Sequence, residues 1–143
     1  AEFDVLEALF PIRGPHTIGR SAMQRFGGAR GHQGLDNFAR CGTPLAAATK
    51  GVVHFTGFQA RAGNYVVVNT PDGASFAYMH LRDPALVRKG QRVFAGQRLG
   101  YVGQTGRASG CHLHFEQWTA PGWYQGGHPV DPLGELTRWD AWS

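Results

Sequence analysis

The sequence contains little charge and no long apolar run, which argue against a disordered chain and a membrane-spanning one, and it begins without a hydrophobic leader. Charged residues make up 17% of the 143 residues and hydrophobic residues 42%, which is typical of a folded globular chain. No apolar run approaches the roughly 18 residues of a membrane-spanning helix. We therefore expect no membrane span, and we expect that any export signal has been removed or left out of this sequence.

Dense runs of basic residues are also absent, although the net charge is +4 and the sequence pI about 9.5. A basic protein of this size attracts polyanions, such as nucleic acid, anionic lipid or the anionic polymers of a cell wall. The arginines are scattered along the chain, which argues against a nucleic-acid partner. Ordinary solubilising charge explains the excess equally well, and we expect a monomer.

Glycine, by contrast, is abundant: the chain has 21 glycines and 8 prolines, which favour short strands joined by tight turns. The turn signal Thr70-Pro71-Asp72-Gly73 predicts a hairpin. Residues 4–10 fit a helical turn or an edge strand, whereas 11–31 and the tail from Thr119 on are expected to be irregular. The β-like runs are residues 51–58, 64–70, 74–80, 99–102 and 111–118. With no repeat or linker, the sequence predicts a single mainly β domain over residues 1–143.

Two histidines in the last of these runs point to a functional site. Side chains alternate between the faces of a strand, so His112 and His114 share one face, roughly 7 Å apart. Leu113 and Phe115 take the opposite, apolar face. Buried imidazoles need a hydrogen-bond partner or a metal, although a lone His-x-His motif is only moderately specific.

A second cluster, His32-Gln33-Gly34-Leu35-Asp36, offers an imidazole and a carboxylate. The glycines disfavour a helix, so we expect a turn that leads into a short strand. Catalytic zinc sites use three protein ligands and a water, and His32, Asp36 and either His112 or His114 would supply that number.

His80 ends another predicted strand, where alternation places it on the face of Phe76 and Tyr78. A histidine with ordinary hydrogen-bond partners at a strand end is an alternative reading of this residue.

The only two cysteines flank these clusters: Cys41 follows Asp36 by five residues, and Cys111 precedes His112. If the two histidine-bearing segments meet at one site, the sulfurs come close enough to bond. A disulfide would imply an oxidising compartment and would stabilise the fold by roughly 4 kcal/mol. Two free buried thiols remain the alternative.

Together these motifs resemble the signature of the lysostaphin/LytM-type (β-lytic) zinc endopeptidases, which act on bacterial peptidoglycan. The resemblance rests on His32-x-x-x-Asp36, on Tyr78-Met79-His80-Leu81 and on the run from Gly110 to Glu116, in this order. Cys41-Gly42-Thr43-Pro44-Leu45 and several Gly and Val segments match as well, so that the similarity covers about residues 27–133. It implies a mostly antiparallel sheet with a zinc site in a groove.

Carried over by position, the resemblance implies that His32, Asp36 and His114 bind Zn²⁺ and that His80 and His112 are catalytic. Many relatives have a tyrosine where this chain has Phe26, and often a proline where it has Cys111. Glu116 shares the face of His112 and His114 and is a rival general base, although a role in orienting a ligand or in the structure is favoured.

The resemblance implies an extracytoplasmic zinc endopeptidase that hydrolyses a peptide bond in the cross-bridge or stem of peptidoglycan. The competing hypothesis is a non-catalytic wall-binding or regulatory module on the same scaffold. Such modules typically lose one or more metal ligands, whereas all five expected positions are filled here.

Overall fold

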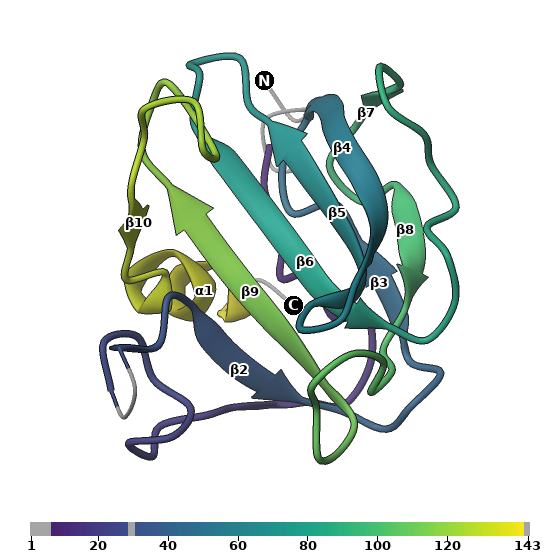
Figure 1. The fold of residues 1–143 in the computed structure, drawn as a ribbon, viewed down its shortest axis with the longest axis vertical. Coiled ribbons are helices and arrows are strands. Elements are labelled where there is room, and N and C mark those ends of the chain that lie inside the picture. The colour runs from purple at the N-terminus through teal and green to yellow at the C-terminus, as the bar shows by residue number, and fades with distance from the viewer. Residues whose placement is uncertain (1–6, 29–30, 142–143) are drawn as a thin grey trace.

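A computed structural model of the chain describes residues 7–28 and 31–141, and its main element is one antiparallel sheet (Figure 1). A second, two-stranded sheet pairs β3 (Pro44–Ala46) with β8 (Arg98–Tyr101). The eight-stranded main sheet has the order β1 (Thr17–Ile18), β2 (Leu35–Phe38), β9 (His112–Trp118), β6 (Ser75–Leu81), β5 (Gly63–Asn69), β4 (Gly51–Gln59) and β7 (Arg92–Val93), with β10 (Pro129–Val130) beside β9. The expected mainly β, antiparallel fold is confirmed.

The five β-like runs of the sequence correspond to β4, β5, β6, β8 and β9. The predicted turn is also present: the Gly73 amide donates to the Thr70 carbonyl (3.0 Å), and β5 and β6 form the hairpin around it. The prediction of an irregular tail is wrong for two segments, because Pro129–Val130 form β10 and Leu133–Asp140 form helix α1. Residues 11–31 were also expected to be irregular, but Thr17–Ile18 form β1. Of residues 4–10, only 7–10 lie within the described part, where Ala8 makes an isolated bridge to Thr49.

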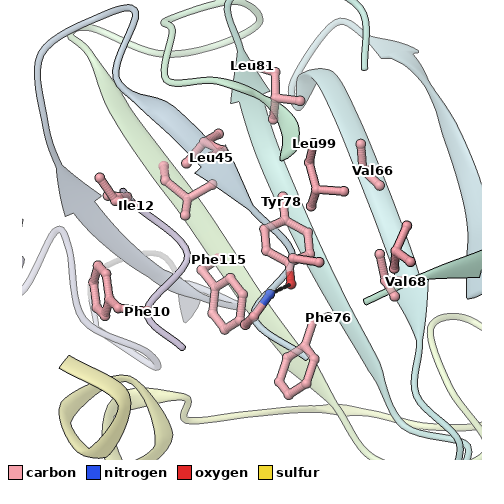
Figure 2. Close-up of a cluster of buried hydrophobic side chains, with 14 of the residues drawn as sticks. Phe10, Ile12, Leu45, Val66, Val68, Phe76, Tyr78, Leu81, Leu99 and Phe115 are labelled. Atoms are coloured by element: carbon pink, nitrogen blue, oxygen red, sulfur yellow. Dashed lines mark hydrogen bonds between the residues drawn. The ribbon is translucent and has the colours of Figure 1, made fainter. Parts of the chain in front are cut away.

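The hydrophobic core fills the space between one face of the main sheet and the smaller sheet (Figure 2). Phe76 and Phe115 come from neighbouring strands and stack at 5.3 Å, and Trp139 of α1 packs edge-on against both rings. The Tyr78 hydroxyl is fully buried there and accepts a hydrogen bond from the Ala48 amide (2.9 Å). The helix therefore covers the core face of the sheet and leaves the opposite face to other side chains.

That opposite face carries the polar residues of β9. Leu113 and Phe115 enter the core, so His112, His114 and Glu116 must project from the other side of the same strand. None of the helices in the described part of the chain has the length and apolar character needed to cross a membrane.

Candidate metal centre

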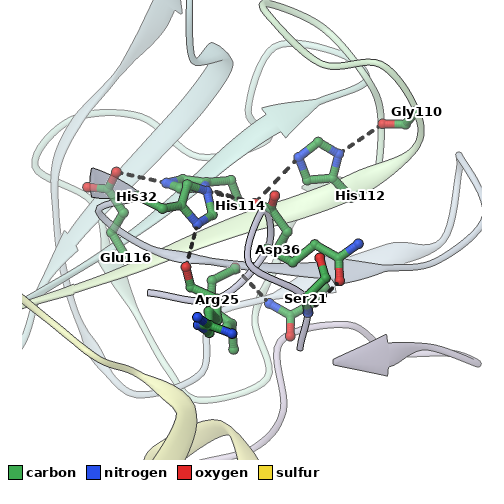
Figure 3. Close-up of polar contacts among 11 residues, drawn as sticks. Ser21, Arg25, His32, Asp36, Gly110, His112, His114 and Glu116 are labelled. Atoms are coloured by element: carbon green, nitrogen blue, oxygen red, sulfur yellow. Dashed lines mark hydrogen bonds and ion pairs between the residues drawn. The ribbon is translucent and has the colours of Figure 1, made fainter. Parts of the chain in front are cut away.

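Strands β2 and β9 bring the two histidine-bearing segments of the sequence together. They pair antiparallel with Asp36 opposite His114 and Phe38 opposite His112, so the carboxylate and both imidazoles share one face (Figure 3). His112 is 9% exposed and His114 8% exposed. The short strand expected after His32 is present as β2, and its pairing with β9 places Asp36 directly beside His114.

Three side chains converge on one point and form what we call the metal centre: His32, Asp36 and His114. One potential ligand atom from each lies within 4.8 Å of the other two. The Asp36 Oδ1 atom is 3.4 Å from His32 Nε2 and 3.0 Å from His114 Nδ1. Ligands about 2.1 Å from a tetrahedral zinc ion lie roughly 3.4 Å apart, so this donor set fits the ion in both chemistry and spacing.

His80 and His112 lie next to the metal centre and next to each other. Their ring centroids are 4.7 Å apart, and the His80 ring is 6.1 Å from that of His114. The His112 Nε2 atom is 3.6 Å from Asp36 Oδ1. All five residues that the resemblance singled out are thus gathered in one place.

Backbone carbonyls fix the orientation of three of these rings. The Nδ1 atom of His32 lies 3.1 Å from the Arg25 carbonyl, and that of His112 lies 2.9 Å from the Gly110 carbonyl. His80 Nδ1 is 2.8 Å from the Thr105 carbonyl. A carbonyl can only accept a hydrogen bond, so each Nδ1 carries a proton, and the lone pair of the neutral tautomer is on Nε2.

His114 is oriented in the opposite sense. Its Nδ1 atom faces Asp36, while its Nε2–H donates to Glu116 Oε2 at 2.9 Å. Burial opposes a charge on this ring, but the hydrogen bonds to Asp36 and Glu116 outweigh that effect and raise the pKa of His114 to about 9. Without an ion, His114 is therefore an imidazolium, and a metal would replace its Nδ1 proton.

The backbone of His80 differs from the sequence-based expectation. The prediction that His80 shares a face with Phe76 and Tyr78 is wrong, because those two side chains enter the core and His80 turns towards His112. The register between β5 and β6 shifts here, and His80 has a left-handed backbone with φ of 67°. This bulge adds a residue to β6 and redirects the side chain to the site.

Electrostatics at the site favour a bound cation and a neutral His80. Burial would raise the pKa of Asp36, but hydrogen bonds from His114 and His32 hold it well below its usual range. Burial lowers the pKa of His80 to about 4, so this ring is neutral at physiological pH. Asp36 is correspondingly an anion throughout that range.

The cysteines form the expected disulfide. Cys41 and Cys111 are bonded across 70 residues of sequence, just beyond the paired ends of β2 and β9. The bond thus joins the two segments that carry Asp36 and His112.

Three residues that support the site were not singled out from the sequence in this role. Thr105 and Trp118 make hydrogen bonds that only the fold reveals. Gly34 leaves room for His114: a Cβ at this position would lie 2.7 Å from His114 Nε2 and 2.5 Å from the Phe115 carbonyl oxygen. In the sequence Gly34 signals only that a helix is disfavoured, because nothing local indicates its proximity to a ring 80 residues away.

Comparison with known proteins relates this arrangement to bacterial peptidases. The chain is 45% identical over 85 residues to the peptidoglycan DD-endopeptidase ShyA of Vibrio cholerae, covering 59% of this chain and 20% of that protein. It is 36% identical over 115 residues to the DD-carboxypeptidase/endopeptidase Mpg of Neisseria meningitidis, covering 76% of this chain and 25% of the other. The chain therefore spans a quarter or less of the length of these relatives.

Solved structures show the same fold. Lysostaphin from Staphylococcus simulans superposes with a TM-score of 0.76 and 27% identity, covering 92% of this chain and 55% of that one. A zinc-containing peptidase from Vibrio cholerae superposes with a TM-score of 0.70 and 31% identity, covering 87% of this chain and 39% of that one. The model of peptidase family M23 matches residues 30–132, which include all five histidine and aspartate positions of the site. The chain belongs to peptidase family M23.

Proposed function

We propose that this chain is a zinc-dependent endopeptidase that hydrolyses peptide bonds in bacterial peptidoglycan outside the cytoplasm. The observation that carries the proposal is the convergence of His32, Asp36 and His114 beside two further histidines. The relatives named above supply the substrate class. Because ShyA and Mpg are both named as acting on DD bonds, we propose a cross-link between D-configured residues as the bond that is cut.

In this proposal His32, Asp36 and His114 hold the ion through Nε2, a carboxylate oxygen and Nδ1. A zinc ion bound there would polarise the scissile carbonyl and lower the pKa of a bound water. His80 and His112 both present Nε2 towards the site, because their Nδ1 atoms are bound to carbonyls. One of these rings accepts the proton of the attacking water through its Nε2 lone pair. The other would hydrogen-bond the developing oxyanion as an imidazolium, with a proton on Nε2 as well as on Nδ1.

The geometry supports this assignment over Glu116 as the general base. Glu116 is 5% exposed, and its two oxygens accept hydrogen bonds from His114 and Trp118. Both oxygens are thus already engaged by donors that turn the buried carboxylate away from the role of a general base. Replacement of Glu116 by Gln should therefore reduce turnover less than His112→Ala does, and an equal loss would favour the carboxylate.

The disulfide supports an extracytoplasmic location, because such bonds persist in oxidising compartments. We propose a single domain over residues 1–143, centred on about 27–133, that acts as a monomer. Sedimentation of the purified chain would test the oligomeric state.

Metal analysis combined with substrate digestion tests the function as a whole. The wild-type chain should bind one zinc ion, lose it in His114→Ala, and release new amino termini from purified peptidoglycan, identified by mass spectrometry. Peptidoglycans with direct D-configured cross-links and with glycine bridges should be compared. A chain that binds zinc but cuts neither would support a wall-binding or regulatory module, and a chain without zinc would overturn the proposal.

A further inference from the structure

Glu116 lies between His114 of the metal centre and the indole of Trp118, and it accepts a hydrogen bond from each. One carboxylate oxygen accepts from His114 Nε2 at 2.9 Å, and the other accepts from Trp118 Nε1 at 2.8 Å. The three residues alternate along β9 and are 8%, 5% and 3% exposed, respectively. The period of the strand therefore builds a buried chain of hydrogen bonds that starts at a metal-centre ring and ends at an indole.

In the metal centre, the Nδ1 atom of His114 faces Asp36, so its other ring nitrogen, Nε2, needs a separate hydrogen-bond partner, which is Glu116. A carboxylate accepts but does not donate at neutral pH, so Glu116 keeps a proton on His114 Nε2. The lone pair available to a metal is then the one on Nδ1. Rotation of the Glu116 carboxyl group would remove this constraint.

Trp118 prevents that rotation. Its indole N–H donates to the second carboxylate oxygen, and its ring packs against that of Tyr124, with the two centroids 4.6 Å apart. We propose that Glu116 and Trp118 are positioning residues for the metal: Trp118 fixes the carboxylate, which fixes the tautomer and ring orientation of His114. Metal affinity thereby depends on an indole that does not contact the metal centre.

This inference rests on the proposed zinc site, and it is tested by zinc affinity rather than by turnover. Competition with a chelator should give a dissociation constant about 10-fold weaker for Trp118→Phe, the lower end of the effect of removing an outer partner of a metal ligand. Trp123→Phe is the matched control, because it removes an indole N–H for which the described structure shows no acceptor. Its affinity should stay within twofold of wild type.

A double-mutant cycle separates positioning from loss of packing. In Glu116→Gln the side chain offers one acceptor oxygen for two donors, so the single variant should also bind zinc more weakly. If Trp118 acts through Glu116, adding Trp118→Phe to Glu116→Gln should weaken zinc binding little further. Additive losses in the cycle, or an unchanged affinity in Trp118→Phe, would overturn the inference.

The same titrations distinguish this inference from the proposed function. Failure of the wild-type chain to bind zinc overturns the metal site itself, and the positioning role with it. Wild-type binding that Trp118→Phe leaves intact overturns only the positioning role. Thermal unfolding of each variant, monitored by circular dichroism, establishes that the affinities refer to folded protein. Should Trp118→Phe fail to fold, the single variant Glu116→Gln measured against Trp123→Phe still decides: an affinity equal to the control overturns the inference.

Discussion

At the scale of single residues, His80 has the most unusual backbone of the site. Its φ of 67° lies in the left-handed region, which costs a residue with a Cβ atom roughly 1 kcal/mol or more. The His80 amide donates to the Ala62 carbonyl (2.8 Å) and its ring Nδ1 to the Thr105 carbonyl, and these bonds hold the conformation. The sequence indicated His80 as a site residue, but strand alternation placed it on the wrong face because nothing local signals the bulge.

Replacing His80 should separate stability from activity. The free energy of unfolding of His80→Gly should be about 1 kcal/mol larger than that of His80→Ala, because glycine adopts positive φ without a Cβ penalty. The glycine variant should therefore be the more stable of the two. Both variants should lose peptidoglycan hydrolysis. Urea unfolding of the two proteins measures the difference directly, and equal midpoints would show that the left-handed backbone stores no strain.

The pKa of His80 predicts a specific loss of stability in acid. The folded-state pKa is about 4, and the ordinary value is 6.5, so as pH falls the unfolded chain takes up the proton first. Stability contributed by neutral His80 is complete above pH 6.5 and declines by up to about 3 kcal/mol as pH falls to 4.

Unfolding of chelator-treated protein at several pH values tests this. His80→Gly should lose less stability than wild type between pH 6.5 and 4, while Asp36 and His114 remain common to both proteins. Parallel curves would contradict the assigned burial of the ring.

At the scale of elements, the catalytic side of the site depends on how a loop packs against a hairpin. Thr105 lies in the loop between β8 and β9, where its hydroxyl donates to the Leu81 carbonyl (2.6 Å) and accepts from the Asn64 amide (3.1 Å). The loop also approaches the tip of the β4–β5 hairpin so closely that a Cβ on Gly106 would lie 2.3 Å from the Gly63 nitrogen. This packing places the Thr105 carbonyl that orients His80.

Thr105→Val keeps the side-chain shape but removes the acceptor of the Asn64 backbone N–H and one of the two donors to the Leu81 carbonyl, to which Asn64 Nδ2 still donates. We expect a stability loss of about 1–3 kcal/mol and a larger fall in kcat than in zinc affinity, because His80 is misoriented while the metal centre is untouched. Thr56→Val is a suitable control, since within the described residues the Thr56 hydroxyl makes no hydrogen bond. An equal effect of both variants on kcat would refute the role of Thr105.

Strand prediction from the sequence worked for strands of four or more residues, and it failed for those of two or three residues. The runs that became β4, β5, β6 and β9 have seven or nine residues, enough for period-two patterning. The two-residue strands β1, β7 and β10 contain no measurable period. Helix α1 was missed because it follows Pro132 in a glycine- and aromatic-rich tail, and its buried Leu136 and Trp139 are only three residues apart.

The site itself was predictable as a set of residue types but not as a geometry. Family motifs named His32, Asp36, His80, His112 and His114, and the structure brings them together. The partners of the ring nitrogens could not be predicted, because three are backbone carbonyls that carry no residue preference. The Glu116–Trp118 hydrogen bond also depends on side-chain conformations that strand spacing alone does not determine.

At the scale of the whole molecule, the disulfide closes the chain between its two site-bearing segments. Cys41 and Cys111 enclose β3 to β8, which include four of the eight strands of the main sheet and both strands of the smaller one. Trp139 of α1 lies on the opposite side of the sheet from the metal centre, against Phe76 and Phe115. Core packing and the metal centre are therefore connected through β9 and through β2, where Leu35 enters the core beside Asp36.

Removing the disulfide should destabilise the protein without changing its fold. The Cys41→Ala, Cys111→Ala double variant should lose about 4 kcal/mol of unfolding free energy, the loop-closure value for a loop of this length. The zinc affinity of the folded variant should change much less, because hydrogen bonds between β2 and β9 still align Asp36 with His114. Guanidinium unfolding and chelator competition measure the two quantities, and an unchanged unfolding midpoint would contradict the expectation.

The three carbonyls that hold His32, His80 and His112 belong to the main chain, and a main-chain atom survives any change of side chain. Arg25 contributes only its carbonyl to the ring of His32, and its own side chain is exposed. Gly110 has open space where a Cβ would be placed. Side-chain changes at positions such as 25 and 110 should therefore leave the orientation of the imidazoles intact.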